Sequence, residues 1–191
     1  MEGKIIIISA PSGCGKSTVI NAIMERGDLD LQFSVSATNR EPRPGEEHKV
    51  SYYFLSTEEF EQALRDDLFL EHEEVYPGRY YGTLKSEVER IIGNGHNVLL
   101  DIDVNGGIRG KKQLGERALS IFLMPPSIDA LRTRLEGRGS DTREVIDQRV
   151  GRAAYEISPA PLYDSQVVND DLALAVEQTH ELIARFVKPG N

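Results

Sequence analysis

Hydrophobic residues along this chain fall into short continuous runs that are separated by stretches with helical spacing. Three runs have the length of one strand, and they are Ile5–Ile8, Asn97–Ile102 and Ala118–Met124. Such β-branched and aliphatic runs are typical of parallel strands that are covered on both faces. Apolar positions after Lys16 instead recur three and four residues apart, which predicts a helix.

The remaining pattern predicts further elements between and after these runs. Short strands are expected at Phe33–Ser36, Tyr52–Leu55, Phe69–Tyr76, Tyr80–Thr83 and Gln166–Asn169. Helices are expected after Ser56, from Leu84 to about Ile92, from Asn105 to Leu114, from Ser127 to Glu136, from Asp141 to about Ile157 and from Leu172 to Val187. Two helix starts, Ser56 with Glu59 and Asp141 with Glu144, have capping-box spacing.

Strands that alternate with helices predict an α/β fold with a central, mainly parallel sheet. The length suits a single domain, residues 1–191, in which the β-rich segment 34–83 is a small insertion. In such a sheet the ligand lies beyond the carboxyl ends of the strands. Asp101, Asp103 and Asn169 all fall at that edge, so we expect candidate functional residues to converge there.

The segment from Ala10 to Thr18 has the features of a phosphate-binding loop between a buried strand and a helix. Its residues are Ala10, Pro11, Ser12, Gly13, Cys14, Gly15, Lys16, Ser17 and Thr18. Small residues let the backbone curl so that several N–H groups meet phosphate oxygens at a helix N-terminus. Lys16 is expected to reach the β- and γ-phosphates, and the Ser17 hydroxyl to ligate Mg²⁺. Ala10 replaces the first glycine of the strict pattern, which is tolerable if its φ is negative. The alternative is a chance strand–turn–helix that carries a lysine.

Arginines gather in two places in a chain whose formal net charge is −9. The segment Arg132–Arg152 holds six arginines and no lysine, and Arg138 lies between two glycines, as in a loop that closes over phosphates. A solvated helix face explains the arginines at both ends of this segment better. Arg40 and Arg43 form the second group. Two arginine groups and one phosphate-binding loop indicate two phosphate sites, a donor and an acceptor.

Some side chains near these segments have both a structural and a binding interpretation. The segment Leu99–Asp103, which ends in Asp101 and Asp103, resembles a strand end with a carboxylate near a nucleotide-bound metal, and the alternative is a strand-end aspartate that caps the next helix. The neighbouring pairs Tyr52-Tyr53 and Tyr80-Tyr81 can each place one ring in the core and the other in a cleft. Core packing alone is the usual explanation for such pairs.

Composition narrows the compartment and the partners. A net charge of −9 and a pI near 5.0 argue against nucleic acid as the default partner. The single cysteine, Cys14, permits no intrachain disulfide and favours a reducing, cytoplasmic location. No apolar run has the length of a signal-peptide core or a membrane span, so no membrane partner is expected. A secondary hypothesis is that the Cys14 thiol, at a helix N-terminus, is acidified and oxidisable. Monomer and homo-oligomer stay equally open.

Seven segments, taken in order, resemble the guanylate kinase family across nearly the whole chain. They read SAPSGCGKST, FSVSATNREPRPGE, YYFLS, FLEHEEVYPGRYYGT, LLDIDVNGG, LEGRGSDT and VVNDD. The arginine-proline block and the Glu/Tyr-Tyr-Gly-Thr block discriminate most, because a generic P-loop enzyme does not need them. The resemblance implies a P-loop three-layer fold with a core (1–33, 84–125 and 158–191), an NMP-binding insertion (34–83) and a helical lid region (126–157).

The resemblance also implies an activity and a role for each matching residue. The activity is transfer of the γ-phosphoryl of ATP to GMP or dGMP with Mg²⁺, giving ADP and GDP for purine nucleotide metabolism. The GMP phosphate is implied to be held by Arg40, Arg43, Tyr52 and Tyr81, and the guanine by Ser36, Glu71, Thr83 and Asp103. Asp101 is implied to lie near Mg²⁺ and the phosphates, with Asn169 and Asp170 near the adenine of ATP. The implied lid and transition-state cations are Arg134, Arg138 and Arg149, and the implied catalytic set is Lys16, Arg43, Arg138 and Arg149.

The chemistry of guanine agrees with the implied residues. Guanine presents N1–H and N2–H₂ donors that suit the carboxylates of Glu71 and Asp103, and an O6 acceptor that suits the hydroxyls of Ser36 and Thr83. Adenine has the opposite pattern and would leave these groups unpaired, which can reject an analogue by a factor of roughly 10⁴.

Two other functional classes stay open at this point. One is a non-catalytic guanylate-kinase-like interaction module of the kind found in scaffold proteins. The residues that speak against it are Gly13, Gly15, Lys16, Ser17 and Arg138. The other is a related P-loop kinase for another small phosphorylated acceptor, such as a ribose bisphosphate. The residues that favour a guanine nucleotide instead are Arg43, Tyr52, Glu71 and Tyr81.

Overall fold

A five-stranded sheet forms the centre of the computed structural model, which describes residues 3–137 and 142–188. The strand order is β2-β7-β1-β8-β9, and every neighbouring pair is parallel. These strands are β1 (Ile5–Ser9), β2 (Leu31–Phe33), β7 (Asn97–Asp101), β8 (Ala118–Met124) and β9 (Ser165–Val168). The expected α/β fold with a central, mainly parallel sheet is therefore confirmed.

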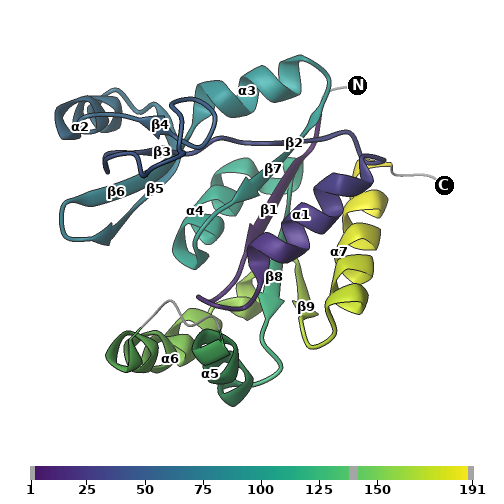
Figure 1. Ribbon diagram of the computed structural model, residues 1–191. Helices are drawn as coiled ribbons and strands as arrows, with labels where there is room; N and C mark the ends of the chain where they lie inside the picture. Colours follow the sequence, from purple (N-terminus) through teal and green to yellow (C-terminus); the bar gives the residue numbers. More distant parts are fainter. Residues whose placement is uncertain (1–2, 138–141, 189–191) are drawn as a thin grey trace.

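Helices cover both faces of this sheet and make three layers (Figure 1). Because successive side chains of a strand point to opposite faces, β1 contributes to two separate cores. Its Ile6 and Ile8 pack with residues of α1 (Lys16–Arg26) and α7 (Leu172–Val187). Its Ile5 and Ile7 pack with residues of α3 (Lys85–Gly93), with α4 (Val104–Leu114) at the edge of the same cluster. The continuous isoleucine run thus corresponds to a strand that is buried on both sides.

A second, four-stranded sheet lies to one side of the central one (Figure 1). Its strand order is β4-β3-β6-β5, formed by β3 (Ala37–Thr38), β4 (Tyr53–Phe54), β5 (Phe69–Tyr76) and β6 (Arg79–Leu84). The helix α2 (Thr57–Arg65) covers it, and Phe60 stacks on Phe69 at a ring distance of 4.4 Å. The capping box that Ser56 and Glu59 predict at the start of α2 is confirmed.

The helices α5 (Ile128–Gly137) and α6 (Arg143–Ile157) form a pair with a small core of their own. Ser127 accepts from the Ala130 N–H at the start of α5, as the sequence predicts. The predicted start of the next helix at Asp141 is wrong, because α6 begins at Arg143 and Thr142 accepts from the N–H of Val145. Asp141 itself lies outside the described residues.

The remaining described elements are two short 3-10 helices. They are η1 (Gly115–Arg117), which leads into β8, and η2 (Ala160–Leu162), which leads toward β9. Across residues 3–137 and 142–188, none of the helices combines the length and the apolar character needed to span a bilayer.

The predicted strand Phe33–Ser36 is also wrong, because the chain changes sheets there. The strand β2 ends at Phe33, and the N–H of Ser34 still donates to the carbonyl of Leu99 on β7 at 3.0 Å. Pairing then stops, and the chain starts again as β3 in the second sheet. A run of strand-forming residues cannot show that one part pairs in one sheet and the rest in another.

One polar network ties the amino-terminal ends of β8 and β9 to α4. The Asp164 carboxylate accepts from both the N–H and the hydroxyl of Ser120 on β8, each at 2.8 Å. It also pairs with Lys111 of α4 at 2.8 Å. Ser120 is fully buried, so this carboxylate is the partner on which its two donors depend.

We predict that Asp164→Ala lowers the free energy of unfolding by about 2 kcal/mol, because two buried donors of Ser120 lose their acceptor. Urea titration followed by circular dichroism measures the change. Glu177→Ala is the control, since Glu177 pairs with Arg26 at the surface and its loss should hardly move the midpoint. Equal midpoints for the two variants would contradict this role of Asp164.

Candidate active site

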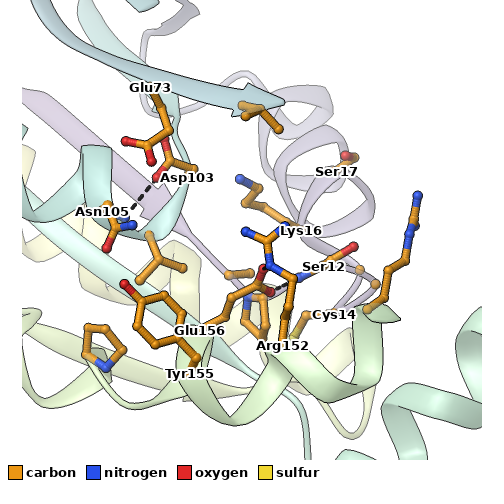
Figure 2. A pocket seen from close by; sticks show the side chains of 18 of the residues that line it. Ser12, Cys14, Lys16, Ser17, Glu73, Asp103, Asn105, Arg152, Tyr155 and Glu156 are labelled. Atoms are coloured by element: carbon orange, nitrogen blue, oxygen red, sulfur yellow. Dashed lines mark hydrogen bonds and ion pairs between the residues drawn. The ribbon is translucent and has the colours of Figure 1, made fainter. Parts of the chain in front are cut away.

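The loop between β1 and α1 has the backbone that the sequence predicts for phosphate binding. Gly13 and Gly15 have φ values of 84° and 87°, in the left-handed region that favours glycine. Ala10 is not among the residues with positive φ, so its methyl group is tolerated, as expected. All residues from 10 to 18 line a cavity of about 400 Å³ at the carboxyl edge of the sheet (Figure 2).

Lys16 points from the first turn of α1 toward the end of the neighbouring strand β7. Its Nζ forms an ion pair with Asp101, the last residue of β7, and donates to the carbonyl of Ile102 at 3.0 Å. Lys16, which the sequence predicts to contact the phosphates, is therefore held at the carboxyl edge of the central sheet, where we expected the functional residues to converge.

Ser17 and Asp101 offer the oxygen atoms that Mg²⁺ prefers. Ser17 is exposed in the first turn of α1, and Asp101 is half-buried beside Lys16. In the described part of the chain, no group of three or more His, Cys, Asp or Glu side chains could hold a metal ion. The donor set fits Mg²⁺ only if phosphate oxygens and water complete the coordination, as is usual for Mg²⁺ bound with a nucleotide.

The helix α6 closes the other side of the cavity. Arg149, Arg152 and Glu156 lie three and four residues apart on one face of α6, and all three line the cavity. The Glu156 carboxylate accepts from the backbone N–H of Ser12 at 3.0 Å (Figure 2). The arginine-bearing helix is thus docked directly on the phosphate loop.

The arginines of the segment Arg132–Arg152 lie in different environments. Arg132 pairs with Asp147 at the surface, which confirms its interpretation as part of a solvated face. The same interpretation is confirmed for Arg152, which is 64% exposed and pairs with Glu156, four residues on, at 3.8 Å. Its side chain also lines the cavity. Arg138 lies outside the described residues. Sequence reasoning missed Glu156 and its neighbour Tyr155, and the helical spacing from Arg149 was the signal that could have found them.

A second hollow lies on the outer side of the phosphate loop. Arg134, Asn169 and Asp170 line it together with Thr18, and Arg134 donates to the carbonyl of Asp170 at 3.4 Å. Asn169 is buried and donates from Nδ2 to the carbonyl of Cys14 at 2.7 Å. The residues that the sequence groups around adenine are therefore brought together, and Asn169 also supports the loop itself.

The secondary hypothesis of an acidified Cys14 thiol is contradicted. The side chain is buried, and its Sγ donates to the carbonyl of Leu123 at 3.4 Å. Burial raises the pKa of Cys14 to about 11, although the charges of Arg134 and Lys16 act in the opposite direction. A thiol in this environment stays protonated and is shielded from oxidants. Cys14 acts as a small apolar residue under the loop.

A second set of anion-binding groups lies in the four-stranded sheet, around Arg40. The guanidinium donates through Nε to the Tyr81 hydroxyl at 3.2 Å and lies 4.9 Å from the ring centre of Tyr52. Its two terminal nitrogens hold both oxygens of Glu46 at 2.6 Å, and one of them also donates to the carbonyl of Glu41. These hydrogen bonds from Arg40 lower the pKa of Glu46 to about 2. Arg40, Tyr52 and Tyr81 are brought together as predicted.

The loop that carries Arg43 is ordered by the same glutamate. The N–H of Arg43 donates to Glu46 at 2.8 Å, while the residue is exposed. Sequence reasoning missed Glu46, although it ends the quoted arginine-proline block. The tyrosine interpretation is confirmed, because Tyr53 and Tyr80 pack against the core of the second sheet while their neighbours face Arg40.

A third cluster, formed by Glu71, Thr83 and Asp103, lies between these two anion sites. Glu71 on β5 is buried, and its Oε1 accepts from the Thr83 hydroxyl at 2.6 Å. Burial raises the pKa of Glu71 to about 7, the Thr83 hydrogen bond acts against that rise, and the charge of Asp103 adds to it. Ser36 is half-buried directly before β3. This cluster, called the Glu71 pocket below, therefore holds one buried carboxyl group whose pKa lies near neutral pH.

Asp103 belongs to two parts of the site. Its Oδ1 accepts from the N–H groups of Asn105 and Gly106 at 2.9 and 3.0 Å, so it caps α4. It also lines the cavity of the phosphate loop, as Glu73 and Asn105 do (Figure 2). The capping interpretation and the ligand interpretation are therefore compatible for this residue. The ligand roles of the predicted site residues stay predictions.

Comparison with known proteins gives one consistent result. The family model described as guanylate kinase matches residues 2–186. A guanylate kinase of Bacteroides thetaiotaomicron is 54% identical over 187 residues, which cover 98% of this chain and 91% of that protein. A guanylate kinase of Porphyromonas gingivalis is 54% identical over 184 residues, which cover 96% of this chain and 98% of that protein.

A solved structure agrees with the sequence matches. The crystal structure of guanylate kinase from Anaplasma phagocytophilum superposes with a TM-score of 0.77 at 32% identity, covering 98% of this chain and 87% of that chain. The match extends over the central sheet, the second sheet and the α5–α6 pair alike. The phosphate loop, the two anion-binding clusters and these matches together show that the chain belongs to the guanylate kinase family.

Proposed function

We propose that this protein is an ATP:GMP phosphotransferase that converts ATP and GMP into ADP and GDP. The observation that carries the proposal is the position of Asp103, which borders both the phosphate-loop cavity and the Glu71 pocket. A donor nucleotide on the loop and a guanine beside Glu71 would therefore meet at one edge of the sheet. The family match supports the same reaction.

In the proposed reaction, an oxygen of the GMP phosphate attacks the γ-phosphorus of ATP in line. The bond between that phosphorus and the bridging oxygen breaks, and ADP leaves with the electron pair. The attacking oxygen is already ionised near neutral pH, so no general base is needed. Catalysis then depends on alignment and on neutralising the charge of the transferred group. We assign the second task to Lys16, Arg43, Arg138 and Arg149.

Each substrate has its own set of donors in this proposal. ATP binds on residues 10–18, with its adenine in the hollow lined by Arg134, Asn169 and Asp170. The GMP phosphate binds near Tyr52, Tyr81 and the two arginines of the loop, Arg40 and Arg43. Of the five N–H donors of Arg40, four are already used within the protein. Arg40 then offers the GMP phosphate one remaining N–H donor from a guanidinium whose position is fixed. Arg43 supplies most of the positive charge that can move to meet this phosphate.

Ser17 and Asp101 would hold Mg²⁺ together with the phosphates, and Mg²⁺ would neutralise charge that develops on them. Asp101 pairs with Lys16 when no nucleotide is bound. A metal would therefore share a carboxylate that already orients the lysine. The guanine contacts fall to Ser36, Glu71, Thr83 and Asp103.

We also propose that segment 34–83 closes over GMP and segment 126–157 over ATP, against the core formed by 1–33, 84–125 and 158–191. Each moving segment has its own apolar cluster, which supports motion as a unit. Closure would exclude water, which otherwise accepts the phosphoryl group. We place the enzyme in the cytoplasm, where its single thiol stays reduced, with nucleotides rather than nucleic acid or membrane as partners. GMP and dGMP are both taken as acceptors.

An acceptor screen tests the function directly. We expect ADP release with GMP and dGMP, and at most a trace with AMP, UMP or sugar phosphates, because only guanine pairs with the carboxyl and hydroxyl groups of the Glu71 pocket. A coupled assay for ADP measures it. Release with a sugar phosphate alone would point to a different P-loop kinase. No release with any acceptor would point to an interaction module.

Lys16→Met is predicted to lower kcat at least about 100-fold, because the charge on the transferred group loses a fixed cation. The same assay measures the rate, and circular dichroism checks that the fold persists. Lys188→Met, on an exposed residue after α7, is the control and should leave kcat unchanged. Near-normal turnover in the Lys16→Met enzyme would contradict a catalytic role for the phosphate loop.

We predict that GMP affinity rises as the pH increases from 6 to 8. The pKa of Glu71 is about 7 before GMP binds, and only the ionised carboxylate can accept the guanine donors, so GMP binding is linked to proton release. Calorimetry at several pH values measures it. Glu71→Gln should weaken GMP binding far more than it weakens ATP binding. It should also remove the pH dependence of GMP binding, apart from the part that titration of the GMP phosphate itself causes. Identical pH profiles for both proteins would exclude Glu71 from the guanine pocket.

A further inference from the structure

The start of α4 carries a glycine, Gly106, which the proposed reaction does not use. It belongs to the LLDIDVNGG segment and lies three residues after Asp103. Its N–H donates to Asp103 Oδ1 at 3.0 Å, as part of the helix cap. Gly106 is buried, and its backbone is not in the left-handed region. The backbone therefore gives no reason for a glycine at this position.

The space around Gly106 does give a reason. A Cβ atom at this position would lie 2.8 Å from Asp103 Oδ2 and 2.6 Å from Ile102 Cγ2, and closer still to Glu71 Oε2. Real Cβ atoms essentially never approach other atoms within 3.0 Å. One carboxyl oxygen from β5 and one from the cap of α4 thus converge on the volume that a side chain would fill.

We infer that Gly106 is a positioning residue for guanine recognition. Its missing side chain lets the Glu71 and Asp103 carboxyl groups converge on one point, where they can accept adjacent donors of one base. This inference rests on the proposed function, since it concerns how the same pocket reads guanine. The buried Glu71 and the half-buried Asp103 lie so close together that their charges raise the energy of the free protein, and a ligand that donates to both relieves that cost.

The substitution Gly106→Ala isolates the effect of the missing methyl group. Alanine keeps the N–H that donates to Asp103 and has the higher helix propensity, by roughly 0.8–1.0 kcal/mol. The nearest of the crowded atoms is the end of a flexible side chain, so the Glu71 carboxyl can turn away, whereas the buried Ile102 has to shift slightly, which the Tm reports. We therefore expect the added methyl group to turn the Glu71 carboxyl group away from its present direction, and so to weaken guanine binding.

The same helix offers a matched control. A Cβ at Gly110 would meet only Ile7 Cδ1, at the ordinary contact distance of 3.5 Å. Gly110→Ala thus makes the same chemical change in α4 without touching the pocket. A general effect of alanine on this helix would appear in both variants, and a packing effect at Ile102 would lower the Tm and affect GMP and ATP alike. An effect on guanine recognition would raise the KM for GMP only in Gly106→Ala.

The test measures steady-state kinetics with GMP, with IMP, which lacks the N2 amino group, and with ATP, together with the Tm of each protein. For Gly106→Ala we expect the KM for GMP to rise about tenfold or more, because a hydrogen bond to a charged group is lost or bent. The KM for ATP should stay within about twofold of the wild-type value, and kcat should fall by a much smaller factor than the KM for GMP rises. The ratio of kcat/KM for GMP to that for IMP should decrease. Gly110→Ala should match wild type in all these values.

Wild-type kinetics for Gly106→Ala would overturn the inference and leave the proposed function intact. Equal losses for GMP and ATP would overturn it too, as would a parallel loss in Gly110→Ala. If Gly106→Ala has a lower Tm, GMP and ATP binding are measured by calorimetry at a temperature where both variants are folded, and the same criteria apply. A wild-type protein that phosphorylates no guanine nucleotide would instead reject the proposed function, whatever the variants do.

Discussion

The conformation of the phosphate loop is the constraint on which the rest of this structure depends. The left-handed backbone at Gly13 and Gly15, which glycine adopts without strain, aims successive N–H groups at one point. Here the amide of Asn169 holds the Cys14 carbonyl, and the Cys14 thiol donates to β8. The loop is therefore fixed from the sheet side, by strands whose order brings their carboxyl ends together.

The two anion-binding regions are organised in the same way. In both, carboxylates contact donor groups that are candidates for binding phosphate. Glu156 accepts from the Ser12 N–H, Asp101 pairs with Lys16, and Glu46 holds Arg40. In a chain with a net charge of −9, the cations Lys16 and Arg40 are thus each held in place by a nearby acid.

The sequence predicts the fold well where local chemistry decides it. The buried run Ile5–Ile8, the glycine-rich loop and the helix Leu172–Val187 all follow from hydrophobic pattern and turn chemistry. The path after Phe33 does not, because leaving one sheet for another depends on tertiary pairing. The start of α6 is similar, since Asp141 and Thr142 are both acceptable caps by residue type and the sequence alone does not choose between them.

The candidate site shows the same division. Lys16 and Arg40 could be found because phosphate binding calls for such cations in a glycine loop and in an arginine group, and Glu71 followed from the resemblance to the family. Glu156 could have been found from its helical spacing after Arg149. Glu46 and Gly106 gave no such signal, since the first contacts protein groups and the second acts through an absent side chain. The Cys14 hypothesis failed because the residue's depth under the loop cannot be read from its place beside a helix.

The pairing of Glu46 with Arg40 bears on selectivity among anions. A tethered carboxylate competes with any solution anion at a high effective concentration. If Arg40 binds the GMP phosphate as proposed, free inorganic phosphate or sulfate would bring only the charge that this carboxylate already supplies, and would gain little there. A nucleotide would bring a base as well, whose contacts elsewhere would supply additional free energy. The internal ion pair would thereby favour phosphate groups that arrive attached to a base.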